Sequence, residues 1–93
     1  MRLTGRDILD KFKRKHPQSR APLAAWEALI QKNTFTQFPD LKRTFGTADY
    51  VKPETVFDVS GNKYRVIARV EYHLQAVAVK AVMTHEGYDR WRK

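Results

Sequence analysis

The chain has 93 residues, 42% of them hydrophobic and 12% aromatic, and a formal net charge of +8. This length predicts a single domain spanning residues 1–93, and the apolar fraction is too high for a disordered tail. Because cysteine is absent, disulfide frameworks, thiol nucleophiles and thiolate metal sites are excluded.

The positive charge predicts a polyanionic partner, namely nucleic acid, an anionic membrane surface or an acidic protein, although charge also serves solubility alone. No apolar run approaches the roughly 18 residues of a membrane span, and no signal peptide opens the chain. We therefore expect a cytoplasmic protein without a membrane partner.

The first half of the sequence predicts a short strand followed by helices. Residues 1–4 form the strand, which ends at Gly5, and residues 6–15 form a helix that His16-Pro17 stops. A second helix covers about 19–32 and a third, shorter one covers 39–45. The apolar positions that recur at helical spacing are Ile8, Leu9, Phe12, Leu23, Trp26, Leu29, Ile30, Leu41 and Phe45.

From Tyr50 onward the hydrophobic period changes to two, which predicts strands. These strands cover residues 55–59, 63–72 and 76–84, with a tight turn at Ser60-Gly61-Asn62 and another near 73–75. In the last strand, alternation predicts one face with Val77, Val79, Ala81 and Met83 and an opposite face with Lys80, Val82 and Thr84. Residues 86–93 form a short amphipathic helix or a loose tail.

The predicted fold class is therefore α+β, with the N-terminal helices packed on one face of a small, antiparallel-dominated sheet. In the strand over residues 63–72, one face is apolar: Tyr64, Val66, Ala68, Val70 and Tyr72. The opposite face carries Lys63, Arg65, Ile67, Arg69 and Glu71, and we expect it to be open to solvent.

The cation row of Lys63, Arg65 and Arg69 is the first candidate site. An arginine can hold a phosphate through two parallel N–H bonds and can offset negative charge that builds up in a transition state. The alternative is an ordinary solvated strand face on which Glu71 is a partial ion-pair partner.

His85 is the second candidate, because a histidine at the end of a strand can act as general acid or base near neutral pH. Its alternative role is structural, as for His16 and His73. Tyr88, three residues further on, can stack a base or bind phosphate, or can dock the last turn on the sheet together with Trp91. No His and carboxylate spacing predicts a metal site, so neither a metal nor a cofactor is expected.

Two motifs resemble a known family. The segment Gly61-Asn62-Lys63-Tyr64-Arg65 and the segment Thr84-His85-x-x-Tyr88-Asp89 resemble those of HigB toxins, within the RelE-like superfamily of messenger-RNA-cleaving toxins. Three short segments in the N-terminal half also resemble those of this family, namely Lys15-His16-Pro17, Ala21-Pro22-Leu23 and Phe38-Pro39-Asp40-Leu41.

The resemblance implies a RelE-like fold and a metal-independent endoribonuclease (mRNA interferase) of a type II toxin–antitoxin system. Such a toxin acts on messenger RNA at the ribosome, inhibits translation and growth, and is held by a helix-turn-helix antitoxin of the HigA type. It further implies catalytic roles for Arg65, His85, Lys63 and Tyr88, and RNA contacts from Asn62, Arg69 and Lys80. The rival hypothesis is a non-catalytic module that binds RNA or the ribosome through the same basic face.

Overall fold

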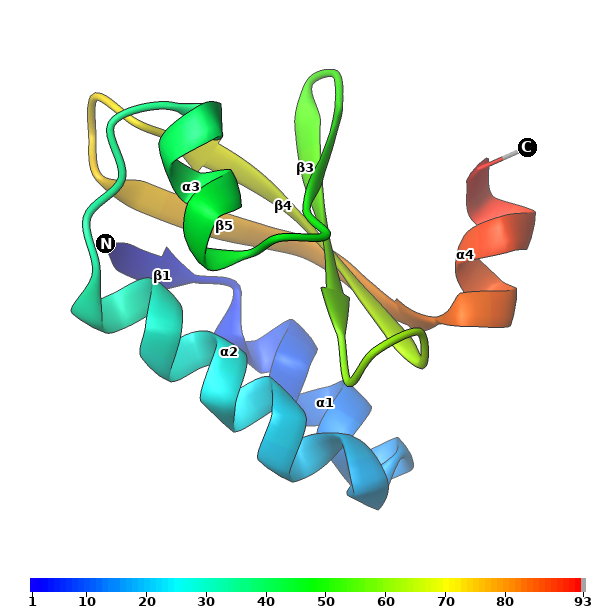
Figure 1. Cartoon of the computed structure of the whole chain (residues 1–93). Coiled ribbons are helices and arrows are strands. Elements are labelled where there is room, and N and C mark those ends of the chain that lie inside the picture. The colour runs from blue at the N-terminus through cyan, green and yellow to red at the C-terminus, as the bar shows by residue number, and fades with distance from the viewer. Residues whose placement is uncertain (93) are drawn as a thin grey trace.

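The sheet contains five strands among the described residues, 1–92, in the spatial order β1-β5-β4-β3-β2 of this computed structural model (Figure 1). β1 runs parallel to β5, and the other neighbouring strands are antiparallel, so the predicted antiparallel-dominated sheet is confirmed. The strands are β1 (Arg2–Thr4), β2 (Asp49–Val51), β3 (Glu54–Val59), β4 (Tyr64–Glu71) and β5 (Ala76–Thr84).

The helices begin and end close to the predicted residues. α1 covers Arg6–Lys15, and the backbone leaves the helical conformation at His16, before Pro17. A 3₁₀ turn, Pro17–Ser19, leads into α2 (Arg20–Lys32), and α3 covers Phe38–Thr44. The three-residue strand β2 was not predicted, because it is too short to show alternation. The C-terminal segment is a helix, α4 (His85–Arg92), and Lys93 lies outside the described residues.

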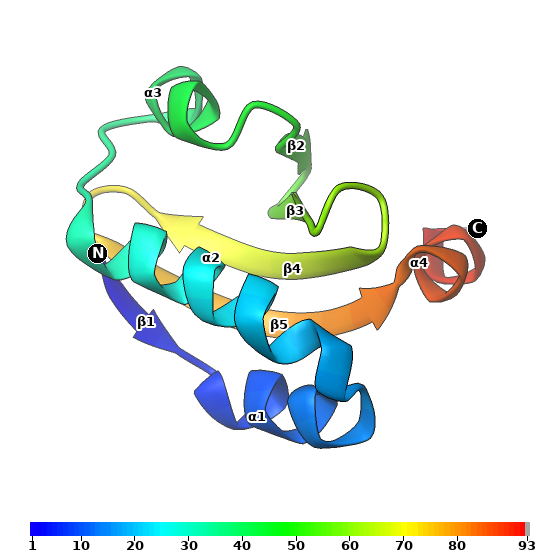
Figure 2. The same cartoon turned by 60° about the horizontal axis from the view of Figure 1, so that its bottom comes forward.

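One face of the sheet is covered by the N-terminal helices, as predicted. Figure 2 shows α2 crossing this face next to α1. Leu9 of α1, Leu23 and Trp26 of α2, and Leu41 of α3 pack into one buried cluster with the apolar side chains of the strands. In β4 these are Tyr64, Val66 and Ala68, with Val70 and Tyr72 at the margin of the cluster, which is the alternation that the sequence predicts.

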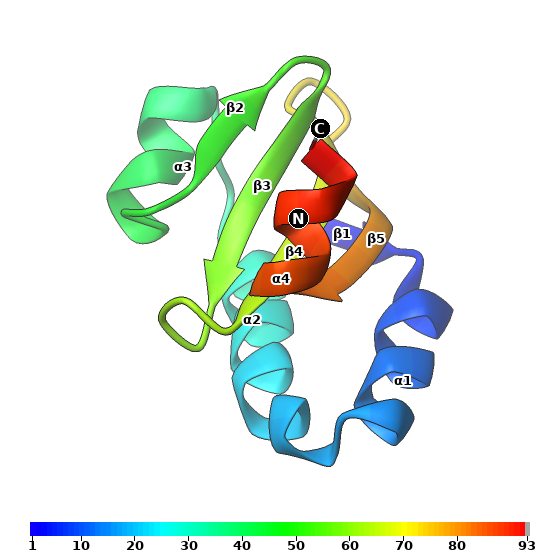
Figure 3. The same cartoon turned by 90° about the vertical axis from the view of Figure 1, so that its right-hand side faces the viewer.

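The second face is not open, and that expectation is wrong. α4 follows β5 directly, and Figure 3 shows it in front of β4, between β3 and β5. Its Tyr88 packs with Val56 of β3 and Ile67 of β4 in a small second core, to which Val51, Ala81 and Met83 contribute at the margin. Arg65, on the same strand as Ile67, is 7% exposed. Of the two cations of β4, Arg65 is therefore covered, whereas the side chain of Arg69 is 43% exposed.

The faces of β5 also differ from strict alternation. Ile67 pairs with Ala81 but Ala68 pairs with Val79, so Lys80 is an extra residue in the strand. Such a β-bulge shifts the period by one residue. Val77, Val79 and Val82 consequently contact the main core, whereas Ala81 and Met83 contact the second core. The predicted single face of Val77, Val79, Ala81 and Met83 is thus divided at Lys80.

Candidate active site

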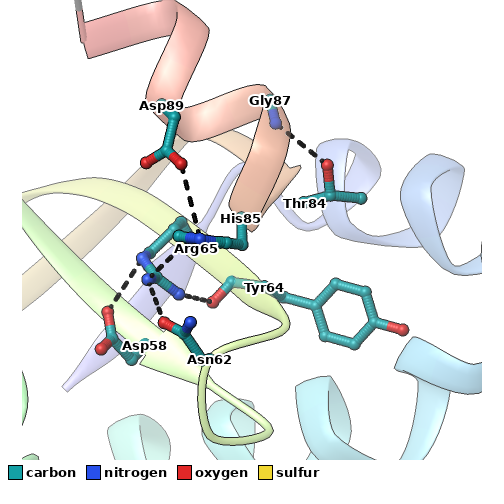
Figure 4. A network of polar contacts seen from close by, with 8 residues as sticks. All are labelled: Asp58, Asn62, Tyr64, Arg65, Thr84, His85, Gly87 and Asp89. Carbon is teal, nitrogen blue, oxygen red and sulfur yellow. Dashed lines mark hydrogen bonds and ion pairs between the residues drawn. The ribbon is translucent and has the colours of Figure 1, made fainter.

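Arg65 is at the centre of the polar contacts in Figure 4. It lies directly opposite Asp58 in the β3–β4 hairpin, and its Nε is 3.1 Å from Asp58 Oδ1. Its Nη2 donates to Asn62 Oδ1 at 2.6 Å, and its Nη1 donates to the Tyr64 carbonyl at 3.2 Å. A buried guanidinium is costly unless it is paired and hydrogen-bonded. The hairpin supplies these partners from residues close in sequence.

The hairpin turn brings the Asn62 side chain next to that of Arg65. Ser60 and Gly61 have positive φ angles of 60° and 66°, and the Lys63 N–H donates to the Ser60 carbonyl at 3.3 Å. Gly61 adopts this left-handed conformation without steric cost. The turn thus places the Asn62 amide oxygen within reach of the guanidinium.

His85 reaches the same guanidinium from α4. Its Nδ1 is 3.3 Å from Arg65 Nη2, and its Nε2 is 3.4 Å from Asp89 Oδ2, one turn along the helix. Because a guanidinium only donates, Nδ1 is the acceptor in this contact and the ring proton is on Nε2, facing the carboxylate. The imidazole is thereby oriented from both sides, while 41% of the side chain remains exposed.

The start of α4 is fixed by backbone contacts. The His85 N–H donates to the Lys63 carbonyl at 2.9 Å, which ties the helix to the hairpin. The Thr84 hydroxyl accepts from the Gly87 N–H at 3.1 Å, the pattern of a threonine N-cap. The position of His85 therefore depends on both the end of β5 and the β3–β4 turn.

Tyr88 completes the cluster through its aromatic ring. The guanidinium carbon of Arg65 is 5.6 Å from the centre of the Tyr88 ring, within the range of a cation–π contact. Tyr88 is 6% exposed. Its ring therefore docks the helix on the sheet and supports Arg65 at the same time.

Of the seven candidate residues, four share side-chain contacts, one joins them through its backbone, and two lie apart. Arg65, His85, Tyr88 and Asn62 share contacts. Lys63 joins them through its carbonyl, and its side chain is exposed. Among the described residues, Arg69 and Lys80 have no recorded contact with this cluster. Arg69 Nε is instead 3.5 Å from Glu54 Oε2.

The acidic partners lie elsewhere than expected. Sequence reasoning suggested Glu71 as a partial partner of the cation row, but Asp58 and Glu54, both on β3, pair with Arg65 and Arg69. Asp58, Asp89 and Thr84 were missed as site residues. The spacing of His85 and Asp89 by four residues was a readable signal, and the Ser60-Gly61 turn implied the Asp58–Arg65 register.

The cluster offers a fixed positive charge next to an oriented imidazole. This combination can bind an anionic group and transfer a proton at the same place. Within residues 1–92, no group of three or more His, Cys, Asp or Glu side chains is gathered as for a metal ion. No described helix has the length and apolar character needed to cross a membrane.

One tyrosine outside the site has a shifted pKa. Burial raises the pKa of Tyr72 above its usual value of 10.0, with smaller contributions from Tyr50 and Asp40. Its hydroxyl is buried and has no hydrogen-bond partner among the described residues. This group concerns stability, because it lies at the other end of β4 from Arg65.

Comparison with known proteins agrees with the motifs. Residues 19–91 match the family HigB_toxin, described as the RelE-like toxic component of a toxin–antitoxin system. The "mRNA interferase toxin HigB" of Escherichia coli strain K12 is 35% identical over 92 residues, which cover 96% of this chain and 88% of the relative. An "mRNA interferase HigB" of Escherichia coli O6:H1 is 26% identical over 93 residues, covering 97% and 90%. With its α+β fold and its match over most of both sequences, the chain belongs to the HigB family of RelE-like toxins of toxin–antitoxin systems.

Proposed function

We propose that this HigB-family toxin cleaves messenger RNA at the cluster of Arg65 and His85, without a metal ion. The relatives named mRNA interferases support the substrate and the endoribonuclease activity. The contact that supports this location of the active site is the 3.3 Å separation between His85 Nδ1 and Arg65 Nη2. It puts a proton acceptor next to a permanent positive charge, which is what attack by a ribose 2′-OH on the adjacent phosphorus requires.

Arg65 would hold the scissile phosphate. Asp58, Asn62, Tyr64 and His85 already occupy most of its donors in the structure. A phosphate that takes two parallel N–H bonds therefore has to replace at least one of these partners, and His85 and Asn62 share the exchangeable nitrogen Nη2. Exchange at Nη2 leaves the Asp58 ion pair in place and releases His85 Nδ1 toward the substrate.

His85 would then be the general base. Its free Nδ1 takes the proton of the 2′-OH as the bond from the 2′-oxygen to phosphorus forms, and the bond from phosphorus to the 5′-oxygen breaks. Asp89, 3.4 Å from Nε2, stabilises the imidazolium that results. The 5′-oxygen needs a proton, and the exposed ammonium of Lys63, in the turn beside His85, is the proposed donor.

The remaining candidate residues would act outside the reacting atoms. The Tyr88 ring packs against the guanidinium, and Asn62 Oδ1 accepts a hydrogen bond from Arg65 Nη2. Arg69 and Lys80 would attract the RNA backbone further along the sheet. The partners we propose are the ribosome that carries the messenger and a HigA-like helix-turn-helix antitoxin, and the place of action is the cytoplasm.

The test is His85→Gln. We expect the rate of a single turnover to fall by about 10²-fold or more, because glutamine cannot accept the proton. Melting temperature and RNA affinity should stay near those of the unchanged protein, since the cations carry the attraction. His73→Gln, in the exposed β4–β5 turn, is the matched control. A stable His85→Gln protein with an unchanged rate would remove His85 from the chemistry.

A further inference from the structure

Beside the cluster, one large aromatic side chain is open to solvent. Trp91 lies in α4 and is 49% exposed, whereas Trp26 is 3% exposed. A single exposed apolar side chain is common on protein surfaces and by itself indicates nothing. What distinguishes Trp91 is the group on which it rests.

Trp91 stacks on Tyr88, with ring centres 5.8 Å apart and planes 26° from parallel. Tyr88 in turn lies under the guanidinium of Arg65, at 5.6 Å. The three side chains are therefore connected by contacts from guanidinium to phenol to indole, a series that we call the column. Tyr88, in its middle, is 6% exposed and is held by Val56 and Ile67.

The column has one occupied and one unoccupied end. At the inner end Arg65 is surrounded by Asp58, Asn62 and His85. At the outer end the indole stacks on Tyr88, and 49% of the residue's surface meets solvent. Tyr88 is packed in the second core, so the indole has a fixed ring to stack on. An aromatic face that is held in place loses little conformational freedom when a flat group binds.

We propose that the open face of Trp91 is a stacking platform for an RNA base near the scissile phosphate. This inference rests on the proposed function, because it uses the phosphate bound at Arg65 as the second anchor of the same strand. Stacking on an aromatic ring accepts any base, since every base has a π-face. The platform therefore adds affinity and fixes the path of the strand without selecting a sequence.

An RNA strand fits this surface better than an acidic protein segment does. The indole is connected through Tyr88 to the group that would hold phosphate, so one nucleotide chain can use both ends of the column. Arg90 and Arg92, exposed and adjacent to Trp91 in the sequence, add positive charge to the last turn of α4. A basic surface that carries an exposed aromatic ring is the usual arrangement of single-strand binding sites.

The experiment measures binding of a 2′-O-methyl RNA hexanucleotide, which cannot be cleaved because it has no free 2′-OH. Its association should quench tryptophan fluorescence, and the quenched residue is Trp91 because Trp26 is buried. In Trp91→Phe the affinity should be largely kept and the quenching lost. In Trp91→Ala the affinity should fall by about 10-fold.

Two controls separate stacking from charge and from general damage. An oligomer of the same length with abasic sugars keeps the phosphates, and it should bind Trp91→Ala as well as the unchanged protein. Tyr50→Ala removes an aromatic side chain of similar exposure (52%) from the edge strand β2, and it should not alter RNA affinity.

The outcomes that overturn the inference are distinct from failure of the proposed function. If Arg65→Lys weakens binding of the hexanucleotide and Trp91→Ala does not, only the platform is wrong. If Trp91→Ala leaves RNA binding unchanged but weakens binding of the cognate antitoxin, the indole belongs to a protein interface. If the hexanucleotide binds neither the unchanged protein nor its variants, the RNA site itself is misplaced.

Discussion

Arg65 connects the two halves of the site, and its contacts predict what its replacement does. Its side chain is 9% exposed, and that of its partner Asp58 is 26% exposed. Removing the guanidinium leaves a half-buried carboxylate and the Asn62 amide without their donor. An unsatisfied buried polar group costs about 1–3 kcal/mol of stability.

We therefore expect Arg65→Ala to lose both RNA cleavage and stability, whereas Arg65→Lys separates the two. Lysine keeps the charge near Asp58 but cannot offer two parallel N–H bonds to a phosphate, so the cleavage rate should fall at least about 10-fold with a smaller loss of stability. Urea denaturation and single-turnover cleavage measure the two effects. Arg43→Lys, exposed in α3, is the control, and equal rates for Arg65→Lys and Arg43→Lys would contradict the role of Arg65.

Tyr72 predicts the response of stability to alkaline pH. Its pKa is raised in the folded protein, first by burial, above the value of 10.0 of the unfolded chain. The folded state therefore holds the proton more tightly, and its contribution is complete below about pH 10 and is lost as pH rises through the folded pKa. Tyr72→Phe should reduce the loss of stability above pH 10.0, and it also removes an unpartnered buried hydroxyl. Urea midpoints at neutral and alkaline pH test this, and parallel curves for the two proteins would refute it.

At the scale of elements, the sequence predicted those parts that depend on local periodicity and stop signals. The bounds of α1 follow from the spacing of Ile8, Leu9 and Phe12 and from the His16-Pro17 stop. The faces of β4 follow from strict alternation. The candidate residues Arg65, His85 and Tyr88 were chosen by chemistry and by resemblance, and the structure brings their side chains together.

What the sequence did not predict depends on contacts between distant segments or on the register of paired strands. Whether α4 covers the second face is decided by Tyr88 meeting Val56 and Ile67, and nothing in α4 alone specifies that contact. The pairing of Arg65 with Asp58 requires the register of the hairpin. The bulge at Lys80 leaves no compositional sign, since Lys80 alternates normally with its neighbours in the sequence.

At the scale of the whole molecule, the net charge is +8, and the acidic side chains pair with particular cations. Glu27 of α2 pairs with Lys13 and Arg6, and the acids of β3 pair with Arg65 and Arg69. Each pair offsets part of the positive charge that its cations offer to RNA at long range. The attraction of RNA therefore depends on the exposed cations of the turn and helix surfaces, and it should weaken steeply as salt is added.

The whole site also predicts the effect of chelation. Because the proposed chemistry uses Arg65 for charge and His85 for proton transfer, cleavage of naked RNA should continue in excess EDTA. The measurement is the single-turnover rate with and without chelator, using His85→Gln as the blank for contaminating nucleases. Activity that disappears with EDTA and returns with added Mg²⁺ would show that a metal ion supplies part of the chemistry.

The bulge at Lys80 makes β5 one residue longer than its pairing with β4 needs. If Lys80 is deleted, Val79 and Ala81 become neighbours, and ordinary alternation then directs Val79 and Val82 to the main core and Ala81 and Met83 to the second core. Deletion of Lys80 should thus be tolerated. Deletion of Ala78, two positions earlier, would instead turn Val79, the residue between Ala78 and the bulge, to the opposite face of the sheet. We expect the Lys80 deletion to unfold cooperatively and the Ala78 deletion not to fold. This result would show that β5 contains one residue more than its fold requires.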